Sequence, residues 1–482
     1  MPGAARRDRQ RRKRGSRLDA ARDGLRDRHR SGALARVRPG RPGAARASAR
    51  QPPADGRSDR LDGARRLSDP VGGARAAAEG VHARLANDVE ALTAIARGSA
   101  DEGELAAARW ASRRLADAAG VAARVERFRY RRTFAHVHAL HFAAGAIAAR
   151  ARGSQRPLVR GLGRAAAAAT LAAFELDYSG RRQLLAALPP VGTGANVVCE
   201  LPSPPASDVG ASAAASRAAA LASRERRVVL VAHLDAARAG IIWHPAIVRP
   251  GDRLARRSGR RASLALVPEL ALAAVALAPA ATARAAGRLL AAAALLTAES
   301  LARAPVPGAN DNASGVAAVL ELARRLAARP PANAAVEVVL TGAEEAGMGG
   351  MAAYLASAGA RSDRANTLFL GLDTVGSGEP VVLVAEGGAW PVRYRERDVE
   401  LARAAARRAG LPVPRRWRIG GWTDPALARL RGFPALSLLS VRDGGFPNYH
   451  RPGDVPAHVD IDCVAAVVDI AEAIVRAWAS ER

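Results

Sequence analysis

The sequence predicts an α/β fold of three layers, in which helices cover both faces of a mixed, largely parallel sheet. From residue 196 onwards, short runs rich in valine and leucine recur along the chain, and amphipathic helical patterns separate most of them. Continuous apolar strands that alternate with helices are typical of parallel sheets buried on both faces. The six strand-like runs are NVVCEL (196–201), RVVLVAH (227–233), AVEVVLT (335–341), TLFLGLD (367–373), PVVLVAE (380–386) and PALSLLS (434–440).

The first 79 residues differ in composition from the rest of the chain. Residues 1–79 are rich in Arg, Gly, Pro and Ala and have almost no large apolar side chains. Such a segment cannot bury enough surface to offset its chain entropy, so we expect a disordered Arg-rich extension. No apolar run follows the early arginines, so we also expect no signal peptide. The main domain is then expected at residues 80–482, with order beginning near Val81.

Two helices and a strand are expected before the sheet region. Residues 82–96 carry apolar side chains at helical spacing, and residues 101–120 begin with acidic residues and end at Gly120, as helices often do. Residues 124–130 then predict a strand. Later helices are predicted at 314–328, 397–410 and 460–479 between or after the strand-like runs.

Charge and cysteine content exclude some classes of function. The net charge is +28, from 73 basic and 45 acidic residues, but Lys13 is the only lysine, as biased codon usage would produce. Few aromatic residues are available to stack on bases, so we expect no nucleic-acid partner. Cys199 and Cys463 are the only cysteines, which excludes a disulfide framework or a thiolate zinc site.

Residue types that bind metals follow the apolar runs at five places. Each cluster alone also has a structural explanation, such as a turn or a helix cap. Together they supply enough nitrogen and oxygen donors for two zinc ions and one free carboxylate. Ligands of such folds bind beyond the carboxyl ends of the strands, which is where the clusters lie. The clusters, which predict a hydrolase, are His233 with Asp235, Asp311, Glu344 with Glu345, Asp373, and His450.

These clusters and the residues around them resemble the co-catalytic di-zinc aminopeptidases, peptidase family twenty-eight, whose relatives include glutamate carboxypeptidases and glutaminyl cyclases. The resemblance covers about residues 81–480 and implies the zinc-exopeptidase fold. DNASG and AEEAG are its most specific motifs. The matching stretches are VVLVAHLDA, PGANDNASGVAAVLELAR, VEVVLTGAEEAGMGGMAAYL, LFLGLDTVG, GGWTDPALARLRGFPAL and NYHRPGDVPAHVDID.

The resemblance also implies a role for each cluster. His233 and Asp373 would hold one zinc ion, Glu345 and His450 the other, and Asp311 would bridge the two. Glu344 would be the general base. Asp235 would act behind His233, and a cis peptide would join Asp311 to Asn312.

The function that follows is that of a zinc-dependent exopeptidase, and an aminopeptidase acting on peptide substrates in particular. A glutamate would activate a metal-bound water for attack on the N-terminal peptide bond. Two alternatives stay open. One is a glutaminyl cyclase-like acyltransferase with a single zinc, and the other is a catalytically inactive, membrane-associated interaction module. The sequence does not reveal the residue cleaved, the native metal or the oligomeric state.

Two alanine-rich stretches, at about 134–190 and 240–305, interrupt the matching regions and predict helical insertions. A membrane span needs about 20 predominantly apolar residues. Residues 262–283 come close, with Glu269 as the one charge. Two interpretations remain: the insertions associate with a membrane, or they cap the active site of a cytoplasmic protein.

Overall fold

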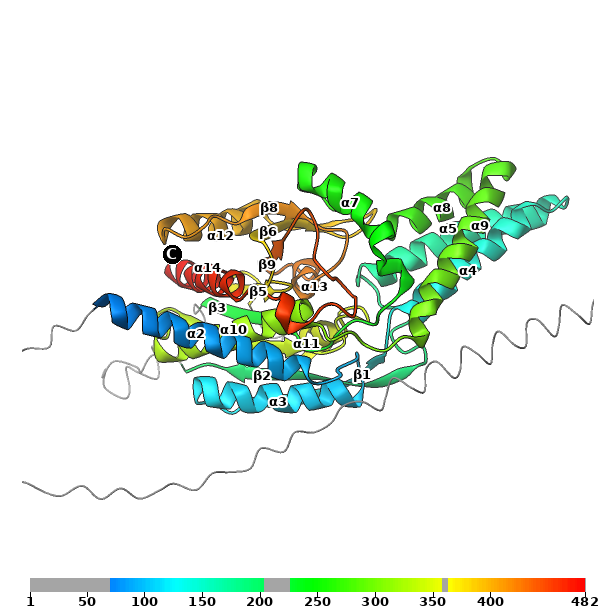
Figure 1. The fold of residues 1–482 in the computed structure, drawn as a ribbon. Helices are drawn as coiled ribbons and strands as arrows, with labels where there is room; N and C mark the ends of the chain where they lie inside the picture. The colour runs from blue at the N-terminus through cyan, green and yellow to red at the C-terminus, as the bar shows by residue number, and fades with distance from the viewer. Residues whose placement is uncertain (1–69, 203–225, 358–362, 482) are drawn as a thin grey trace, which may run out of the picture. The chain divides into compact units, whose positions relative to one another are not determined.

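A single mixed β-sheet forms the centre of the structure. The computed structural model describes residues 70–202, 226–357 and 363–481 (Figure 1). The nine strands follow the order β1-β2-β4-β3-β5-β9-β6-β7, and β8 pairs with β6. The strands are β1 (Arg124–Arg131), β2 (Val191–Glu200), β3 (Arg226–His233), β4 (Ala334–Thr341), β5 (Thr367–Leu372), β6 (Glu379–Glu386), β7 (Val392–Arg393), β8 (Arg415–Arg418) and β9 (Ala435–Val441).

The four central strands of the sheet are parallel. β4, β3, β5 and β9 pair in parallel, whereas β1, β2 and β6 join the sheet by antiparallel pairings. Every residue of β4, β5 and β9 is buried, which explains why these segments read as continuous apolar runs and not as alternating ones. All carboxyl ends of the four central strands therefore meet at one edge.

Helices cover both faces of this sheet and confirm the predicted three-layer fold. Five helices, each in contact with at least one other of the five, cover one face of the sheet. Two shorter helices pack together on the opposite face. The first layer contains α2 (Pro70–Thr93), α3 (Glu102–Ala119), α10 (Ser314–Ala328), α12 (Glu396–Arg408) and α14 (Ile461–Ser480); the other contains α11 (Gly349–Ser357) and α13 (Asp424–Leu430).

Helix α2 begins earlier than expected. The Arg-rich extension was expected to run to residue 79, but residues 70–79 belong to α2. Proline is well tolerated in the first turn of a helix, and the alanines that follow favour continuation of the helix from its packed half. That half buries Leu85, Val89 and Leu92. Residues 1–69 lie outside the described residues.

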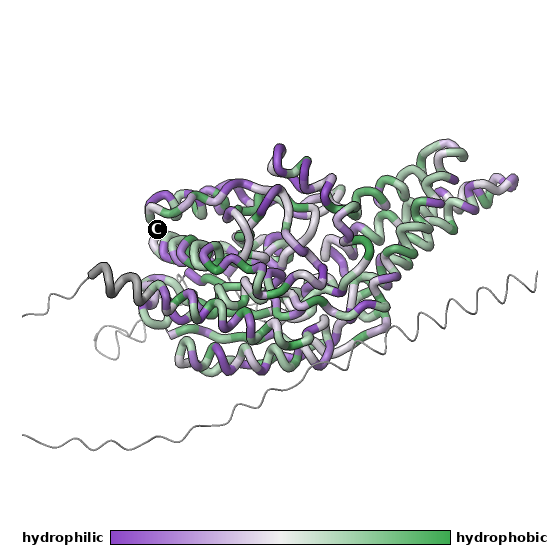
Figure 2. Tube along the Cα trace, viewed as in Figure 1, coloured by the Kyte–Doolittle hydropathy of each residue, from purple (hydrophilic) through white to green (hydrophobic). Residues whose placement is uncertain are grey.

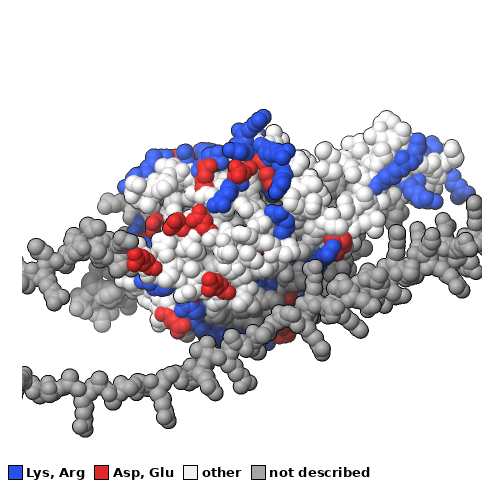
Figure 3. Space-filling model, viewed as in Figure 1, with Lys and Arg blue, Asp and Glu red and all other residues white. Residues whose placement is uncertain are grey.

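Four helices form a second, smaller core beside the sheet. They are α4 (Ala135–Arg152), α5 (Pro157–Tyr178), α8 (Leu266–Leu277) and α9 (Ala280–Ala298), and they lie in the two alanine-rich stretches. Phe142, Phe174, Leu272 and Leu290 are buried among them. Figure 2 shows that these helices are largely apolar, and Figure 3 shows basic side chains towards their far end. The remaining helix of this region, α7 (Pro245–Ser258), and the short turn η2 (Ile241–Trp243) precede α8.

Candidate metal centre

The five predicted clusters meet at the carboxyl edge of the parallel strands. His233 is the last residue of β3, and Asp373 follows the last residue of β5 directly. The Glu344–Glu345 pair lies in the turn after β4, and His450 lies in the turns after β9. Asp311 lies in the segment η4 (Ala309–Ala313) that leads into α10. The strand order therefore brings together residues that are far apart in the sequence.

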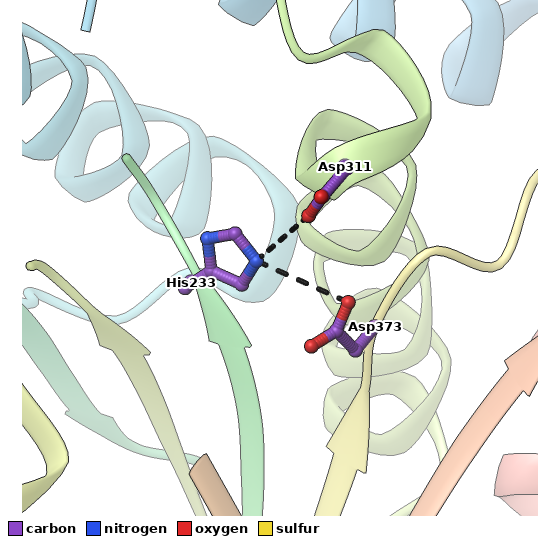
Figure 4. Close-up of side chains that lie close together, drawn as sticks. All are labelled: His233, Asp311 and Asp373. Carbon is purple, nitrogen blue, oxygen red and sulfur yellow. Dashed lines mark hydrogen bonds and ion pairs between the residues drawn. The ribbon is translucent and has the colours of Figure 1, made fainter. Parts of the chain in front are cut away.

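His233, Asp311 and Asp373 form the first group of donor atoms. The Nε2 atom of His233 lies 3.2 Å from Oδ1 of Asp311 and 3.9 Å from Oδ1 of Asp373. Figure 4 shows both carboxylates facing this nitrogen from separate elements. The Nδ1 atom of His233 lies 3.1 Å from the backbone carbonyl of Asp235. A carbonyl only accepts, so Nδ1 donates this hydrogen bond and Nε2 is left as the nitrogen that could bind a metal ion.

His450, Asp311 and Glu345 form the second group. The Nε2 atom of His450 lies 3.1 Å from Oδ2 of Asp311 and 3.1 Å from Oε2 of Glu345. Asp311 thus directs one carboxylate oxygen to each group. Within the described residues these are the two sets of side chains close enough together to hold a metal ion.

The donor atoms of both groups fit a zinc ion. Ligand atoms about 2.0–2.1 Å from a tetrahedral zinc ion are separated by roughly 3.3 Å, close to the separations of 3.1 and 3.2 Å in these groups, while the His233–Asp373 separation is wider, at 3.9 Å. Oδ2 of Asp311, Oε1 of Glu345 and both ring nitrogens of His450 are buried and have no hydrogen-bond partner among the described residues. Buried polar atoms without partners are rare unless an ion or a water satisfies them.

The electrostatics of the groups also suit a cation. Burial raises the pKa of Glu345 to about 7, that of Asp373 to about 6 and that of Glu344 well above its usual value. Burial opposes the ionisation of Asp311 as well, but the adjacent imidazole rings of His233 and His450 hold its pKa far below the usual value. Several buried carboxylates crowded together resist ionisation unless positive charge lies beside them, and a divalent cation supplies that charge.

Glu344 lies beside the groups but belongs to neither. Its side chain is buried, and burial together with the charges of Asp424 and Glu345 raises its pKa well above the usual value. Such a carboxyl can exchange a proton with a water molecule in the site without giving up a metal ligand.

Asp235 holds the turn that carries both glutamates. Its Oδ1 accepts the backbone N–H of Glu344 at 3.0 Å, and its Oδ2 accepts that of Glu345 at 3.1 Å. Ser99 donates its hydroxyl to the same carboxylate at 2.6 Å. The carboxylate lies 3.5 Å from the His233 ring, which makes its hydrogen bond to the Asp235 carbonyl instead. Both the backbone carbonyl and the side chain of Asp235 therefore lie next to Nδ1 of His233.

Further buried polar residues fix the turns around the site, and sequence patterns did not single out most of them. Asp454 accepts the backbone N–H groups of Asn310 and Asp311. Asn312 accepts the N–H of Thr374 and so joins the Asp311 segment to the loop after β5. The peptide bond between Asp311 and Asn312 is cis, as the resemblance implied.

Three residues near the donor atoms have left-handed backbone conformations. The φ values are +50° at Ala343, +52° at Thr374 and +53° at His450. This region costs energy for residues other than glycine, most of all for a β-branched residue such as threonine. Backbone strain of this kind occurs where surrounding contacts hold a functional side chain in place.

Glu104 supports the glutamate turn from helix α3. It is fully buried, and its carboxylate accepts the N–H groups of Ala100, Ala195 and Ala343 at 2.7–2.8 Å. In Glu104→Gln the new amide group donates, so it faces backbone donors and leaves at least one of them unsatisfied. We expect a loss of roughly 1–3 kcal/mol in the free energy of unfolding, measured by urea denaturation. The matched control is Glu102→Gln at an exposed position of the same turn, for which we expect only a smaller loss of helix-dipole stabilisation, below about 1 kcal/mol. Equal midpoints for both variants would contradict the supporting role.

Other metal-binding residue types lie away from the site. His138 is enclosed by the rings of Phe134, Phe142, Phe174 and Tyr178, and burial lowers its pKa well below the usual value. His136 and His141 hydrogen-bond to backbone carbonyls. Aromatic packing accounts for His138, and hydrogen bonds to the backbone account for His136 and His141, without a metal.

The inserted segment before α7 reaches the donor groups. Trp243 lies edge-on to the ring of His450, with ring centroids 4.3 Å apart, and it also packs against Tyr449. Tyr449 in turn stacks on His450 at 3.8 Å. The stretch between His233 and Asp311 therefore supplies one wall of the site.

Imidazole and carboxylate donors grouped at the carboxyl edge of such a sheet, next to an unligated glutamate, define the class of metallopeptidases. Residues 294–475 match the model of peptidase family M28. This part of the chain carries four of the five clusters, and its match to that family is what the resemblance predicts.

Similar proteins include several aminopeptidases. The chain is 35% identical over 180 residues to a probable lipoprotein aminopeptidase, LpqL, of Mycobacterium tuberculosis; this match covers 32% of the chain and 36% of that relative, or about a third of its length. Among solved structures, an aminopeptidase from Aneurinibacillus sp. strain AM-1 is 16% identical with a TM-score of 0.47, over 82% of this chain and 93% of that one. The zinc aminopeptidase BSAP of Bacillus subtilis is 14% identical with a TM-score of 0.45, over 82% and 94%.

Proposed function

We propose that the protein is a zinc-dependent aminopeptidase that hydrolyses N-terminal peptide bonds with two zinc ions. The observation that carries the proposal is the position of Asp311, whose two carboxylate oxygens point to separate groups of donors. A carboxylate shared in this way suits a pair of cations. The match with a probable aminopeptidase supports the choice of peptide substrates with a free N-terminus.

Each residue has a distinct task in this proposal. His233 and Asp373 would hold one zinc ion, Glu345 and His450 the other, and Asp311 both. Bound zinc supplies Lewis acidity, which polarises the peptide carbonyl and makes water a better nucleophile. Glu344 removes the proton from the attacking water and delivers it to the departing amine. Asp235 acts as a positioning residue, because it holds the backbone of Glu344 and Glu345.

The single-zinc cyclase alternative differs from this proposal in metal stoichiometry. A cyclase-like site uses one ion, whereas the two groups at Asp311 have room for two. We expect chelation to abolish hydrolysis of aminoacyl chromogenic substrates, and zinc to restore it with a titration end point at two equivalents. Loss of bound metal also lowers the thermal midpoint, because an ion that binds only the folded state stabilises it. An end point at one equivalent, together with cyclisation of N-terminal glutamine, would favour the alternative. Full activity after exhaustive chelation would exclude both.

A further inference from the structure

The four helices beside the sheet form two hairpins whose turns lie together. Helix α4 leads into α5 through residues 153–156, and α8 leads into α9 through residues 278–279. Helix α4 packs on α5, α8 and α9, and α8 packs on α5 and α9. The guanidinium of Arg152, at the end of α4, donates to the carbonyl of Ala278 and joins the two turns. This paired end is called the tip below, and it consists of residues 147–164 and 277–288.

Large apolar side chains project into solvent at the tip. Leu277 is 84% exposed, Leu158 75%, Ile147 70% and Leu162 60%. Single exposed apolar residues are common on protein surfaces, but here they occur on three adjacent helices around one point. Alanine is the commonest residue at the remaining positions, and Figure 2 shows largely apolar helices with hydrophilic residues gathered at their far end.

The charges at the tip are all of one sign. Residues 143–168 and 270–298 contain no aspartate or glutamate. Figure 3 shows basic side chains gathered at this end of the helices. None of the exposed arginines of the tip forms an ion pair with another described residue. They are Arg150, Arg156, Arg160, Arg164, Arg284 and Arg288.

We propose that the tip docks on an anionic membrane surface. Exposed leucines between unpaired arginines match a lipid interface, where apolar side chains enter the acyl boundary and guanidinium groups contact phosphates of the headgroups. The charge complementarity of the six arginines favours lipid over an apolar protein partner, which would leave those charges beside an uncharged surface.

The lengths of the helices favour docking at the surface over spanning. The segment Ala280–Ala302 is the one described helix that is long and apolar enough to cross a membrane. Its hairpin partner α8 has only 12 residues. At 1.5 Å per residue α8 reaches about 18 Å, well short of a hydrocarbon core of about 30 Å. A hairpin that crossed the bilayer would need both helices to span it, so the tip enters one leaflet only.

A fluorescent label at the tip tests the proposal locally. Residues 1–69 also carry many arginines, so vesicle binding alone would not identify the surface involved. Both native cysteines are buried, so a surface cysteine can be labelled selectively. We expect the full chain carrying Leu277→Cys and an environment-sensitive dye to show a several-fold rise in emission with phosphatidylcholine vesicles containing 30% phosphatidylglycerol. Pure phosphatidylcholine should give little change. The matched control is Arg408→Cys on the exposed end of α12, whose emission should stay constant.

Charge reversal provides the second arm. Arg156→Glu, Arg284→Glu and Arg288→Glu, combined in the labelled chain, should weaken the tip response by roughly 100-fold in lipid concentration, since each basic residue contributes about fivefold. The triple control Arg109→Glu, Arg408→Glu and Arg431→Glu changes the same number of exposed arginines elsewhere and should have no such effect. Peptidase activity should be equal in all four chains.

Three outcomes would overturn the proposal. If vesicles bind the chain while the label at residue 277 stays in water, another segment holds the lipid. If emission rises with protein concentration in the absence of vesicles, a second copy of the chain covers the tip. If alkaline carbonate fails to release the protein from membranes, the helices span the bilayer instead of docking on one face.

Discussion

Replacing Glu344 by glutamine is expected to lower kcat by roughly 10²–10⁴-fold while the zinc content stays unchanged. The amide is nearly isosteric with the carboxyl group but cannot accept the proton of the attacking water. Because Glu344 belongs to neither donor group, its replacement removes no ligand. The backbone N–H of residue 344 still reaches Asp235, so the turn is retained. The measurements are steady-state kinetics on an aminoacyl chromogenic substrate and metal analysis of the same sample.

The adjacent residue provides the contrast for this experiment. Glu345→Gln should lose metal as well as activity, because Glu345 lies within the second donor group. Glu379→Gln, at the exposed start of β6, should change neither quantity. An active Glu344→Gln enzyme would remove the general base from the mechanism, whereas an inactive one without zinc would show that Glu344 is itself a ligand.

Replacing Asp311 by asparagine is expected to have the second large effect, the loss of both metal ions and of activity. An amide offers one weak acceptor where the carboxylate directs one oxygen to His233 and the other to His450. Changes to residues that only support metal ligands already cost 10–100-fold in affinity, so the loss of a shared ligand should cost roughly 100-fold or more. Zinc titration followed by calorimetry measures both affinities.

The fold of this variant should survive, which separates metal loss from unfolding. Asp454 binds the backbone of residues 310 and 311 and not the side chain of Asp311, so the segment keeps its anchor. Asp443→Asn, at an exposed turn, serves as the control with unchanged zinc binding. Retention of two tightly bound ions in Asp311→Asn would contradict the shared-carboxylate arrangement, and loss of only one would restrict Asp311 to a single ion.

The strands that carry donors could be predicted because their signal is local. A run such as 228–232 is apolar throughout because both of its faces are buried, and a polar donor, His233, follows it at the end of the strand. The short strands β7 and β8 were not predicted. With two and four residues, and arginines in most positions, they carry no apolar run, and only their pairing with β6 makes them strands.

The supporting residues could not be predicted because they act through pairings distant in sequence. Glu104 reads as an ordinary helical glutamate, yet it accepts an N–H group from a residue 239 positions later. Asp235 could be connected to its near neighbour His233 from spacing alone, but its contacts with the turn 109 residues further on depend on the order of β3 and β4 in the sheet. No spacing rule encodes that order.

The position of Trp243 limits what shortened versions of this protein can reveal. The indole beside His450 and the helices α8 and α9 belong to the same uninterrupted stretch between His233 and Asp311. Deleting that stretch to obtain a smaller enzyme would also remove Trp243 from beside the imidazole of His450. A truncated protein would therefore lose the proposed membrane contact and an aromatic neighbour of His450 together. Point substitutions can test the two separately.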